Sequence, residues 1–269
     1  DPEHAQWLRS HGVGAFFMCG PGDPEGFLYR GELQADGTRA GDQMELIRRL
    51  APTGANCTYL IAVRSHGGDG DATQNPFTGH DPARGINETV LAQWEHWFRA
   101  MDEAGITIYL FIYDDGARIW DTGDEVGEDE ARFLRTLVNR FEHHRNLIWC
   151  VAEEYQERYS PARVSAIAAA IAAADDHRHP IAVHKLDGLD FSEFADDPSI
   201  DQFAIQYNVP TAPELHEGLL RAWRDARGRY SLNLSEAADF GTGAESRRKL
   251  WACATAGAYV MVLDMDVAS

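Results

Sequence analysis

Lysine is nearly absent from this sequence, with Lys185 and Lys249 as the only two among 269 residues. Lysine and arginine together number 24 against 43 aspartates and glutamates, so the formal net charge is -19. A surface this acidic repels the phosphates of nucleic acids and of anionic membranes. We therefore expect no nucleic-acid partner and no membrane association.

Long apolar runs and paired cysteines are missing as well. No segment approaches the roughly 20 apolar residues that a transmembrane helix needs, and we find no targeting segment in this chain. None of the cysteines has a CxxC spacing, and three of the four fall in predicted core strands, which is typical of buried free thiols. Unpaired cysteines favour a cytoplasmic location. The four cysteines are Cys19, Cys57, Cys150 and Cys253.

Short apolar, β-branched segments alternate with amphipathic helical stretches along the whole chain. This alternation is typical of a parallel α/β fold. Several of the segments are apolar throughout, as strands buried on both faces are. The predicted strands are Gly14–Cys19, Asn56–Val63, Ile106–Tyr113, Leu147–Ala152, Ile181–His184, Gln202–Gln206, Tyr230–Leu234 and Ala258–Leu263.

Apolar residues recur at helical spacing between these strands. The predicted helices are Thr89–Ala104, Glu128–Phe141, Pro161–Ala174, Pro213–Ala226 and Ala244–Ala256, with a helical turn at Phe191–Phe194. Eight β/α steps predict one α/β domain over residues 1–269, a (β/α)8 TIM barrel. A doubly wound sheet is the alternative, but no glycine-rich phosphate loop follows the first strand. The chain stops soon after the eighth strand, so the last outer helix is missing or short, which suggests a fragment of a longer protein.

Acidic and hydrogen-bonding residues follow most of the predicted strands. In a barrel, the carboxyl ends of the strands carry the chemistry. A purely structural rim would not gather so many carboxylates, because like charges repel at short range. The candidate residues at these ends are Arg64, His66, Asp114, Asp115, Glu153, Glu154, His184, Tyr207, Asn208 and Glu236, together with Trp120 in the loop after the third strand.

Two of these residues suit the hydrolysis of an acetal. That reaction needs one carboxylic acid to protonate the leaving oxygen and one carboxylate to attack or to activate water. Strands four and seven lie across a barrel mouth from each other, so Glu154 and Glu236 can face a sugar from two sides. The alternative is that each glutamate only begins a solvated helical turn. We predict that the two are a catalytic pair.

The fourth strand also resembles a known signature. Residues 146–154, Asn-Leu-Ile-Trp-Cys-Val-Ala-Glu-Glu, are similar to the segment of clan A glycoside hydrolases in which Asn-Glu ends an apolar strand containing Ile-Trp. The chain looks closest to bacterial glycosidase-like barrels that carry Gly-Glu-Glu there and an N-terminal β-sandwich. Further matches to that group are Phe16–Tyr29, Gly67–Gly70 and Arg247–Gly257. The resemblance implies a retaining mechanism with Glu154 as acid/base and Glu236 as nucleophile.

The chain departs from the clan pattern at two places. Glu153 stands where clan members usually have an Asn that binds the sugar 2-hydroxyl, and its charge should raise the pKa of one member of the Glu153–Glu154 pair. Which of the two delivers the proton stays open. The eighth strand leads to Asp264 and Asp266, where many clan members place a sugar-stacking Trp.

The remaining candidates are expected to bind the sugar or support the pair. The resemblance places Tyr207 against the nucleophile, with plain packing as the alternative. Arg64 either keeps Glu236 ionised or pairs with another acid, and His184 either contacts sugar hydroxyls or is structural. Trp120 offers an aromatic platform for a sugar ring. His66, Asp114, Asp115, Asn208 and Glu153 complete the expected substrate-binding set.

The sequence therefore predicts a glycosidase that acts on an oligo- or polysaccharide, with a carbohydrate as its partner and with neither a cofactor nor a metal ion. A metal-dependent barrel hydrolase is one alternative, because His143-His144 and His177-Arg-His179 could supply ligands. Both pairs fall away from the expected mouth. A glycan-binding barrel with a degenerate site is the other alternative. Carboxyl groups about 5–5.5 Å apart would indicate a retaining glycosidase.

Overall fold

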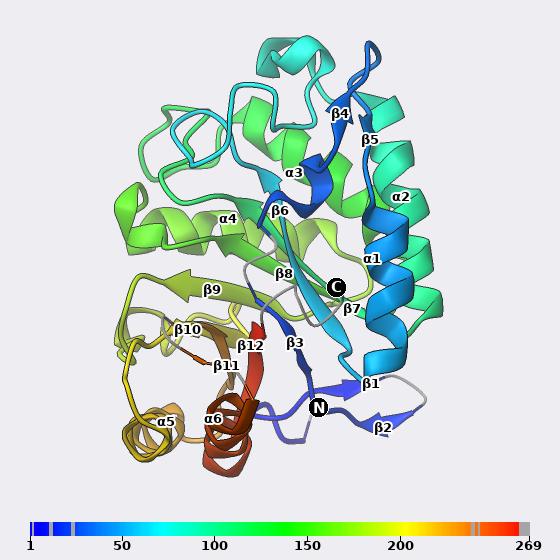
Figure 1. Cartoon of the computed structure of the whole chain (residues 1–269). Helices are drawn as coiled ribbons and strands as arrows, with labels where there is room; N and C mark the ends of the chain where they lie inside the picture. Colours follow the sequence, from blue (N-terminus) through cyan, green and yellow to red (C-terminus); the bar gives the residue numbers. More distant parts are fainter. Residues whose placement is uncertain (2, 11–12, 23–24, 238–239, 242, 264–269) are drawn as a thin grey trace.

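The computed structural model describes the chain except for residues 2, 11–12, 23–24, 238–239, 242 and 264–269 (Figure 1). Its centre is an eight-stranded sheet in the order β3-β12-β11-β10-β9-β8-β7-β6, and all of its strand pairs are parallel. Apart from the closing pair β3 and β12, the order follows the chain, as in a (β/α)8 barrel. The strands are β3 (Cys19–Pro21), β6 (Cys57–Val63), β7 (Thr107–Tyr113), β8 (Leu147–Ala152), β9 (Ile181–Lys185), β10 (Gln202–Gln206), β11 (Ser231–Glu236) and β12 (Ala258–Leu263).

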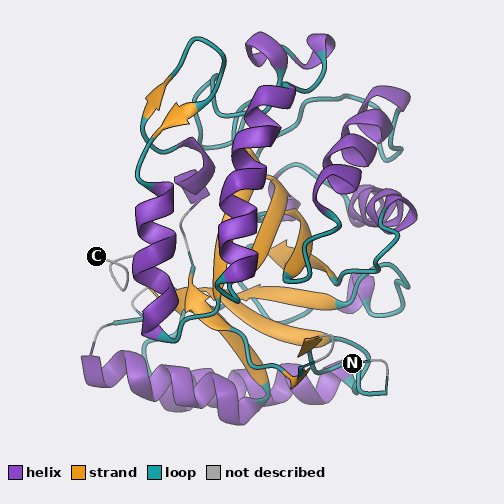
Figure 2. Cartoon of the chain, turned by 90° about the vertical axis from the view of Figure 1, so that its right-hand side faces the viewer, coloured by secondary structure: helices purple, strands orange, loops and turns teal. Residues whose placement is uncertain are grey.

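The helices lie outside the strands (Figure 2). Among the described residues they are α1 (Gln43–Leu50), α2 (Glu88–Glu103), α3 (Glu128–Phe141), α4 (Pro161–Ala174), α5 (Ala212–Ala226) and α6 (Gly243–Ala256). Local chemistry sets where they begin: the side chains of Ser160 and Thr211 accept the backbone N–H groups of Arg163 and Glu214 as N-caps of α4 and α5. None of the helices in the described part of the chain is long and apolar enough to span a bilayer.

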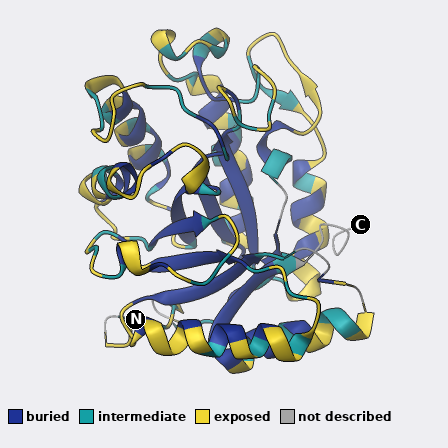
Figure 3. Cartoon of the chain, turned by 90° about the vertical axis from the view of Figure 1, so that its left-hand side faces the viewer, coloured by how far each residue is buried: buried dark blue, intermediate teal, exposed yellow. Residues whose placement is uncertain are grey.

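Two separate apolar layers hold these elements together. Figure 3 shows that the strands are buried and that the helices carry both buried and exposed residues. The outer layer packs the helices against the strands, as Trp94 and Phe98 of α2 illustrate. The inner layer fills the barrel with side chains that include Tyr109 and the free thiols of Cys57 and Cys150. The barrel is therefore a packed core rather than a pore, as barrels of this size are.

Residues at the start of the chain close the barrel. The backbone N–H of Asn56 donates to the carbonyl of Cys19 at 2.8 Å, and the Asn56 side chain binds the backbone N–H of Cys19 and the carbonyl of Phe17, both at 2.8 Å. At Gly20 a Cβ atom would lie 2.2 Å from the carbonyl oxygen of Cys57. The missing side chain lets β3 approach β6, and the nearly closed sheet confirms the predicted fold class.

The prediction of Gly14–Cys19 as the first barrel strand is wrong in its bounds. Gly14–Ala15 forms β2, which pairs antiparallel with β1 (Arg9–Ser10), and the barrel strand begins only at Cys19. The apolar residues of this segment have another use, since Phe16 and Leu8 pack against the inner core. The apolar pattern of Gly14–Cys19 is the same for a barrel strand and for a segment that packs over the amino ends of the strands.

Two further differences concern helices. Helix α1 has only eight residues, too few for the periodicity to stand out, and was not predicted. The long loop after β6 contains two short 3-10 helices, Thr78–His80 and Pro82–Arg84. The predicted absence of a long last helix falls on residues 264–269, outside the described part of the chain.

Closure through Gly20 yields a stability test. Gly20→Ala forces a methyl group against the Cys57 carbonyl and should lower the free energy of unfolding by about 3 kcal/mol. Gly26→Ala is the matched control, because a Cβ there would meet its nearest atom at 3.5 Å, and it should stay within about 0.5 kcal/mol of the parent. Urea denaturation followed by circular dichroism measures both. Equal stability of the two variants would contradict this account of closure.

Candidate active site

A single side-chain amide joins the two glutamates at the mouth of the barrel. The Nε2 atom of Gln206 donates to Oε1 of Glu154 at 2.9 Å and to Oε1 of Glu236 at 2.5 Å. The two carboxylate oxygens are therefore no farther apart than these two bonds laid end to end. The structure thus brings together the pair that the sequence singled out, through a residue that the sequence analysis did not consider.

Strand geometry explains how these three residues meet. Along β10, Gln202 and Gln206 share one face, and Gln202 bonds Tyr109 inside the barrel. The register between β10 and β11 shifts after Ile205, so Gln206 pairs with Glu236 rather than with the residue before it. Such a shift re-aims side chains at the end of a strand.

Glu154 itself adopts an unusual backbone conformation. Its φ of 35° and ψ of 51° lie in the left-handed region, which non-glycine residues rarely occupy. It stands between β8 and the 3-10 helix η5 (Tyr155–Glu157), and its backbone N–H donates to Nδ1 of His184 at 3.0 Å. Strained positions of this kind cluster at functional sites.

His184 is fully buried beside the pair. Because its Nδ1 accepts the Glu154 N–H, the imidazole carries its proton on Nε2, which lies 3.7 Å from Oε2 of Glu236. Burial lowers the pKa of His184 to about 3, so the ring is neutral. The Nε2–H of this neutral ring therefore faces Glu236 across a gap longer than a hydrogen bond.

The environment of Glu154 favours its protonated form. Burial is the main cause that raises its pKa to about 7, and the negative charge of Glu236 adds to it. The hydrogen bond from Gln206 opposes both. Glu154 can therefore carry a proton near neutral pH, as a general acid must.

Glu153 belongs to a second hydrogen-bond network and is more deeply buried than Glu154, although its carboxylate also lies within 4.8 Å of His184 and Glu236. It accepts a hydrogen bond from the Tyr59 hydroxyl and shares another with Asp114. Burial first, and then the contact with Asp114, raise the pKa of Glu153 well above its usual range, so the shared proton resides on Glu153. Arg64 binds Asp114 at 3.0 Å and also pairs with Glu25. Of the two roles expected for Arg64, pairing with another acid is the one seen.

Asp115 follows Asp114 in the chain and lies near Glu154. Burial chiefly, and then the charges of Asp114 and Asp69, raise the pKa of Asp115 to about 6. Carboxylate oxygens of Asp115, Glu154 and Glu157 lie within 4.8 Å of one another. Asp115 is thus within reach of a substrate that binds at Glu154.

Three other predicted residues follow the ends of β10 and β6. The ring of Tyr207 packs over Gly218 of α5, where a Cβ would lie 2.6 Å from it, so Gln206 makes the contact with Glu236 that Tyr207 was expected to make. Asn208 is exposed at the end of β10. His66 is exposed with a φ of 64°, and its ring meets Phe77 edge-on at 6.4 Å.

Trp120 lines a groove beside the mouth. Its ring packs on Phe77 and Phe133 at 6.2 and 5.4 Å, and the groove of about 680 Å³ runs between the loop after β6 and α3. His66 also lines this groove. The expected aromatic platform therefore faces a side groove whose lining does not include the glutamate pair.

Several groups of acids and histidines among the described residues are close enough to hold a metal ion. Besides the group of Asp115, Glu154 and Glu157, two groups contain Glu153. One includes His184 and Glu236, and the other includes Glu25 and Asp114. Hydrogen bonds from Tyr59, Gln206 and Arg64 already serve these carboxylates. A further group lies away from the mouth and contains Glu95, His143 and His144. Asp264 and Asp266 lie outside the described residues.

Three members of the site escaped the sequence analysis: Gln206, Tyr59 and Glu25. Gln206 ends a predicted strand and could have been found by extending the search one residue inward from Tyr207. Tyr59 lies in the middle of β6, and its role depends on a contact with Glu153 that no local pattern encodes.

Comparisons with known proteins bear on the family and the fold of this chain. Residues 59–259 match the Apiosidase-like catalytic domain family. No curated protein matches the chain in sequence. Solved structures share its fold, confirming the resemblance to clan A glycosidases.

Three solved structures illustrate this similarity. A protein from Bacteroides vulgatus described as a candidate glycoside hydrolase has a TM-score of 0.70 at 13% identity, with 97% of this chain and 53% of that one covered. An exo-β-1,4-mannosidase from an Opitutaceae bacterium has a TM-score of 0.67 at 16% identity, with 96% and 53% covered. The endoglucanase catalytic domain of Thermobifida fusca has a TM-score of 0.59 at 14% identity, with 94% and 81% covered. The chain spans about half the length of the first two.

The electrostatics of the pair can be measured directly. In a carboxyl-carbon NMR titration, Glu154 should titrate with a pKa of about 7. Glu236→Gln removes a nearby negative charge and should lower that pKa, whereas Glu214→Gln on α5 should leave it unchanged. A pKa of Glu154 that does not respond to Glu236→Gln would show that the two carboxylates do not interact.

Proposed function

Because the chain belongs to the Apiosidase-like catalytic domain family, we propose that it is a retaining glycoside hydrolase with Glu154 as acid/base and Glu236 as nucleophile. The observation that carries the proposal is the amide of Gln206, which holds both carboxylates. The two hydrogen bonds of Gln206 limit the distance between the bound oxygens of Glu154 and Glu236. This limit is compatible with the roughly 5–5.5 Å between the carboxyl groups of retaining enzymes, whereas those of inverting enzymes lie roughly 6.5–9.5 Å apart.

The first step uses the proton on Glu154. Glu236 attacks the anomeric carbon, the bond from that carbon to the leaving oxygen breaks, and Glu154 gives its proton to that oxygen. The product is a glycosyl ester on Glu236, and the leaving group departs as an alcohol. The raised pKa of Glu154 supports this role, because the acid must be protonated before the reaction begins.

The second step reverses the role of Glu154. Burial is the larger cause of the raised pKa of Glu154, and the charge of Glu236 adds to it. Once Glu236 is an ester it carries no charge, so its contribution disappears and the carboxylate form of Glu154 becomes more favourable. Glu154 then takes a proton from water, and the water oxygen attacks the anomeric carbon and releases Glu236 as a carboxylate. One charge interaction therefore serves both steps.

The surroundings of the two neighbouring glutamates favour Glu154 over Glu153 as the proton donor. Glu153 is buried and its oxygens are engaged by Tyr59 and Asp114. Glu154 is only partly buried and shares Gln206 with the nucleophile. In this proposal Glu153 supports the floor of the site and does not contact the leaving oxygen.

The substrate in this proposal is the glycosidic bond of an oligo- or polysaccharide. The family description names an apiosidase, and two structures of similar fold are a mannosidase and an endoglucanase. Aryl apiosides, aryl mannosides and β-glucans are therefore the first substrates to screen. The rim residues Asp115, Asn208 and His66 are proposed to contact sugar hydroxyls.

Substitution of the pair tests the mechanism. Glu236→Gln should lower kcat/KM by roughly 10⁴-fold for all substrates, since no nucleophile remains. Glu154→Gln should lower it by a similar factor for glycosides with poor leaving groups and far less for dinitrophenyl glycosides, which leave without a proton. A fluorinated sugar that traps the ester should label Glu236, as located by mass spectrometry of peptides.

The matched control for these variants is Glu217→Gln on the outer face of α5, which should keep full activity. Activity that survives both Glu154→Gln and Glu236→Gln would overturn the assignment. Glycan binding without any hydrolysis would instead identify a non-catalytic barrel.

Gln206 makes a second, independent prediction. Gln206→Leu removes the donor that stabilises both carboxylates, so kcat/KM should fall by roughly 10²-fold. Because that hydrogen bond lowers the pKa of Glu154, its loss should move the basic limb of the pH–rate profile to higher pH. Gln93→Leu on α2, which loses bonds to the backbone of Arg39, should leave the limb in place. A basic limb that moves to lower pH would contradict the proposed role.

A further inference from the structure

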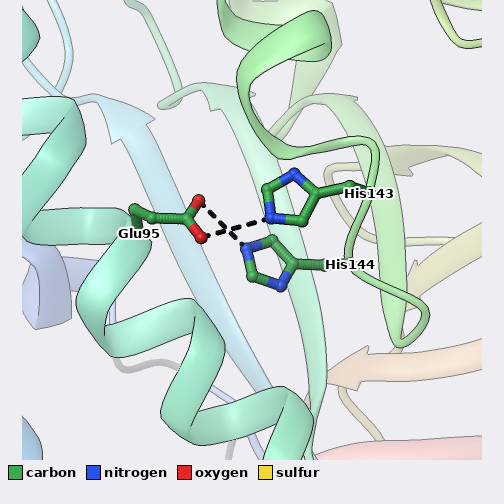
Figure 4. A group of neighbouring side chains, drawn as sticks. All are labelled: Glu95, His143 and His144. Atoms are coloured by element: carbon green, nitrogen blue, oxygen red, sulfur yellow. Dashed lines mark hydrogen bonds and ion pairs between the residues drawn. The ribbon is translucent and has the colours of Figure 1, made fainter.

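A second cluster of ionisable side chains lies away from the mouth. Glu95 projects from α2 toward His143 and His144, which follow α3 (Figure 4). Nε2 of His143 lies 3.2 Å from Oε1 of Glu95, and Nε2 of His144 lies 3.3 Å from Oε2. The ligand atoms of the three residues fall within 4.8 Å of one another. Two imidazoles thus converge on one carboxylate.

The spacing of these atoms also fits ligands around a metal ion. The contacts of 3.2 and 3.3 Å lie at the long end of N–H···O hydrogen bonds, which usually measure about 2.7–3.2 Å. Ligands bound to Zn²⁺ at about 2.0–2.1 Å lie roughly 3.3 Å apart along the edge of a tetrahedron. Each Nε2 lies at about this distance from one carboxylate oxygen, His143 from Oε1 and His144 from Oε2 of Glu95.

Packing holds two of the ligands in place. The side chain of His144 is 3% exposed and that of Glu95 is 13% exposed. The His144 ring contacts Phe98 edge-on at 6.0 Å and stacks on Phe141 at 6.4 Å. These contacts limit how far the ring can turn, so the site is largely formed before any ion arrives.

The third ligand leaves the site open to solvent. The His143 side chain is 55% exposed, which gives an ion a path of entry and leaves room for a water molecule in the fourth position. Arg99 approaches Oε1 of Glu95 at 3.5 Å, but its side chain is 61% exposed and free to withdraw. Two imidazoles and one carboxylate are a ligand set that suits Zn²⁺.

We propose that Glu95, His143 and His144 form a structural site for Zn²⁺ or a similar borderline divalent ion. The ion would tie the middle of α2 to the turn that joins α3 to β8. That turn precedes β8, whereas Glu154 follows it, so the site lies toward the amino ends of the strands, where barrels keep residues for stability rather than chemistry. Its role is distinct from the proposed glycosidase mechanism.

Equilibrium dialysis of the untagged protein against Zn²⁺, followed by elemental analysis, tests the site. The parent chain should retain one ion more than His143→Gln and Glu95→Gln. His96→Gln is the matched control, because His96 neighbours Glu95 on α2, is exposed and stands outside the cluster; this variant should retain as much zinc as the parent. Both test positions are at least partly exposed, so both variants should fold, and circular dichroism checks that they do.

Thermal unfolding and Co²⁺ spectroscopy provide further readouts. At about 100-fold excess over its Kd, Zn²⁺ should raise the Tm of the parent by about 5 °C or more and that of His143→Gln far less. Co²⁺ should give the strong visible absorption of a tetrahedral site. Equal zinc retention by the parent and both cluster variants, or no retention at all, would overturn the proposal and leave a histidine–glutamate ion pair. Neither result bears on the roles of Glu154 and Glu236.

Discussion

Closure of the sheet onto itself is the constraint on which the rest of the structure depends. Strands β8 and β11 are three positions apart in the sheet, about 14 Å along a flat surface. Only a curved and closed wall lets side chains from their ends meet over the middle of the mouth. The close approach of β3 to β6 at Gly20, with the hydrogen bonds of Asn56, completes that wall. A backbone contact on one side of the barrel thus supports the carboxylate pair on the other.

The mouth concentrates negative charge, and it does so with few cations. Arg64 neutralises Glu25 and Asp114, but the other acids depend on protons and on neutral donors. Glu153 keeps its proton by burial, and Glu154 shares the amide of Gln206 with Glu236. Neutralisation by protons fits a chain that has only two lysines. It also makes the charge state of the mouth respond to pH near neutrality.

Those parts of the molecule that depend on local sequence were predictable. The apolar runs of the barrel strands and the spacing of the longer helices led to the fold class and placed Glu154 and Glu236 at strand ends. Gly14–Cys19 was misplaced because an apolar segment that covers a barrel end has the same composition as a strand. Gln206 was missed because its role depends on a register shift between two strands, which neither strand reveals alone. The contact of Tyr59 with Glu153 was missed for the same reason, because it joins two strands and neither strand alone reveals it.

The amide of Gln206 also has a third partner, on its oxygen. That oxygen accepts the backbone N–H of Asp187 at 2.7 Å, and the Gln206 carbonyl accepts the N–H of Gly188 at 2.9 Å. With its donors on the two glutamates and its acceptor on the loop after β9, the side chain has no equivalent flipped orientation, since the oxygen would then face two carboxylates. The loop, with Asp187 at a φ of 32°, and the carboxylate pair are therefore mechanically linked. A ligand that displaced this loop would remove a hydrogen bond from the side chain that holds the two carboxylates.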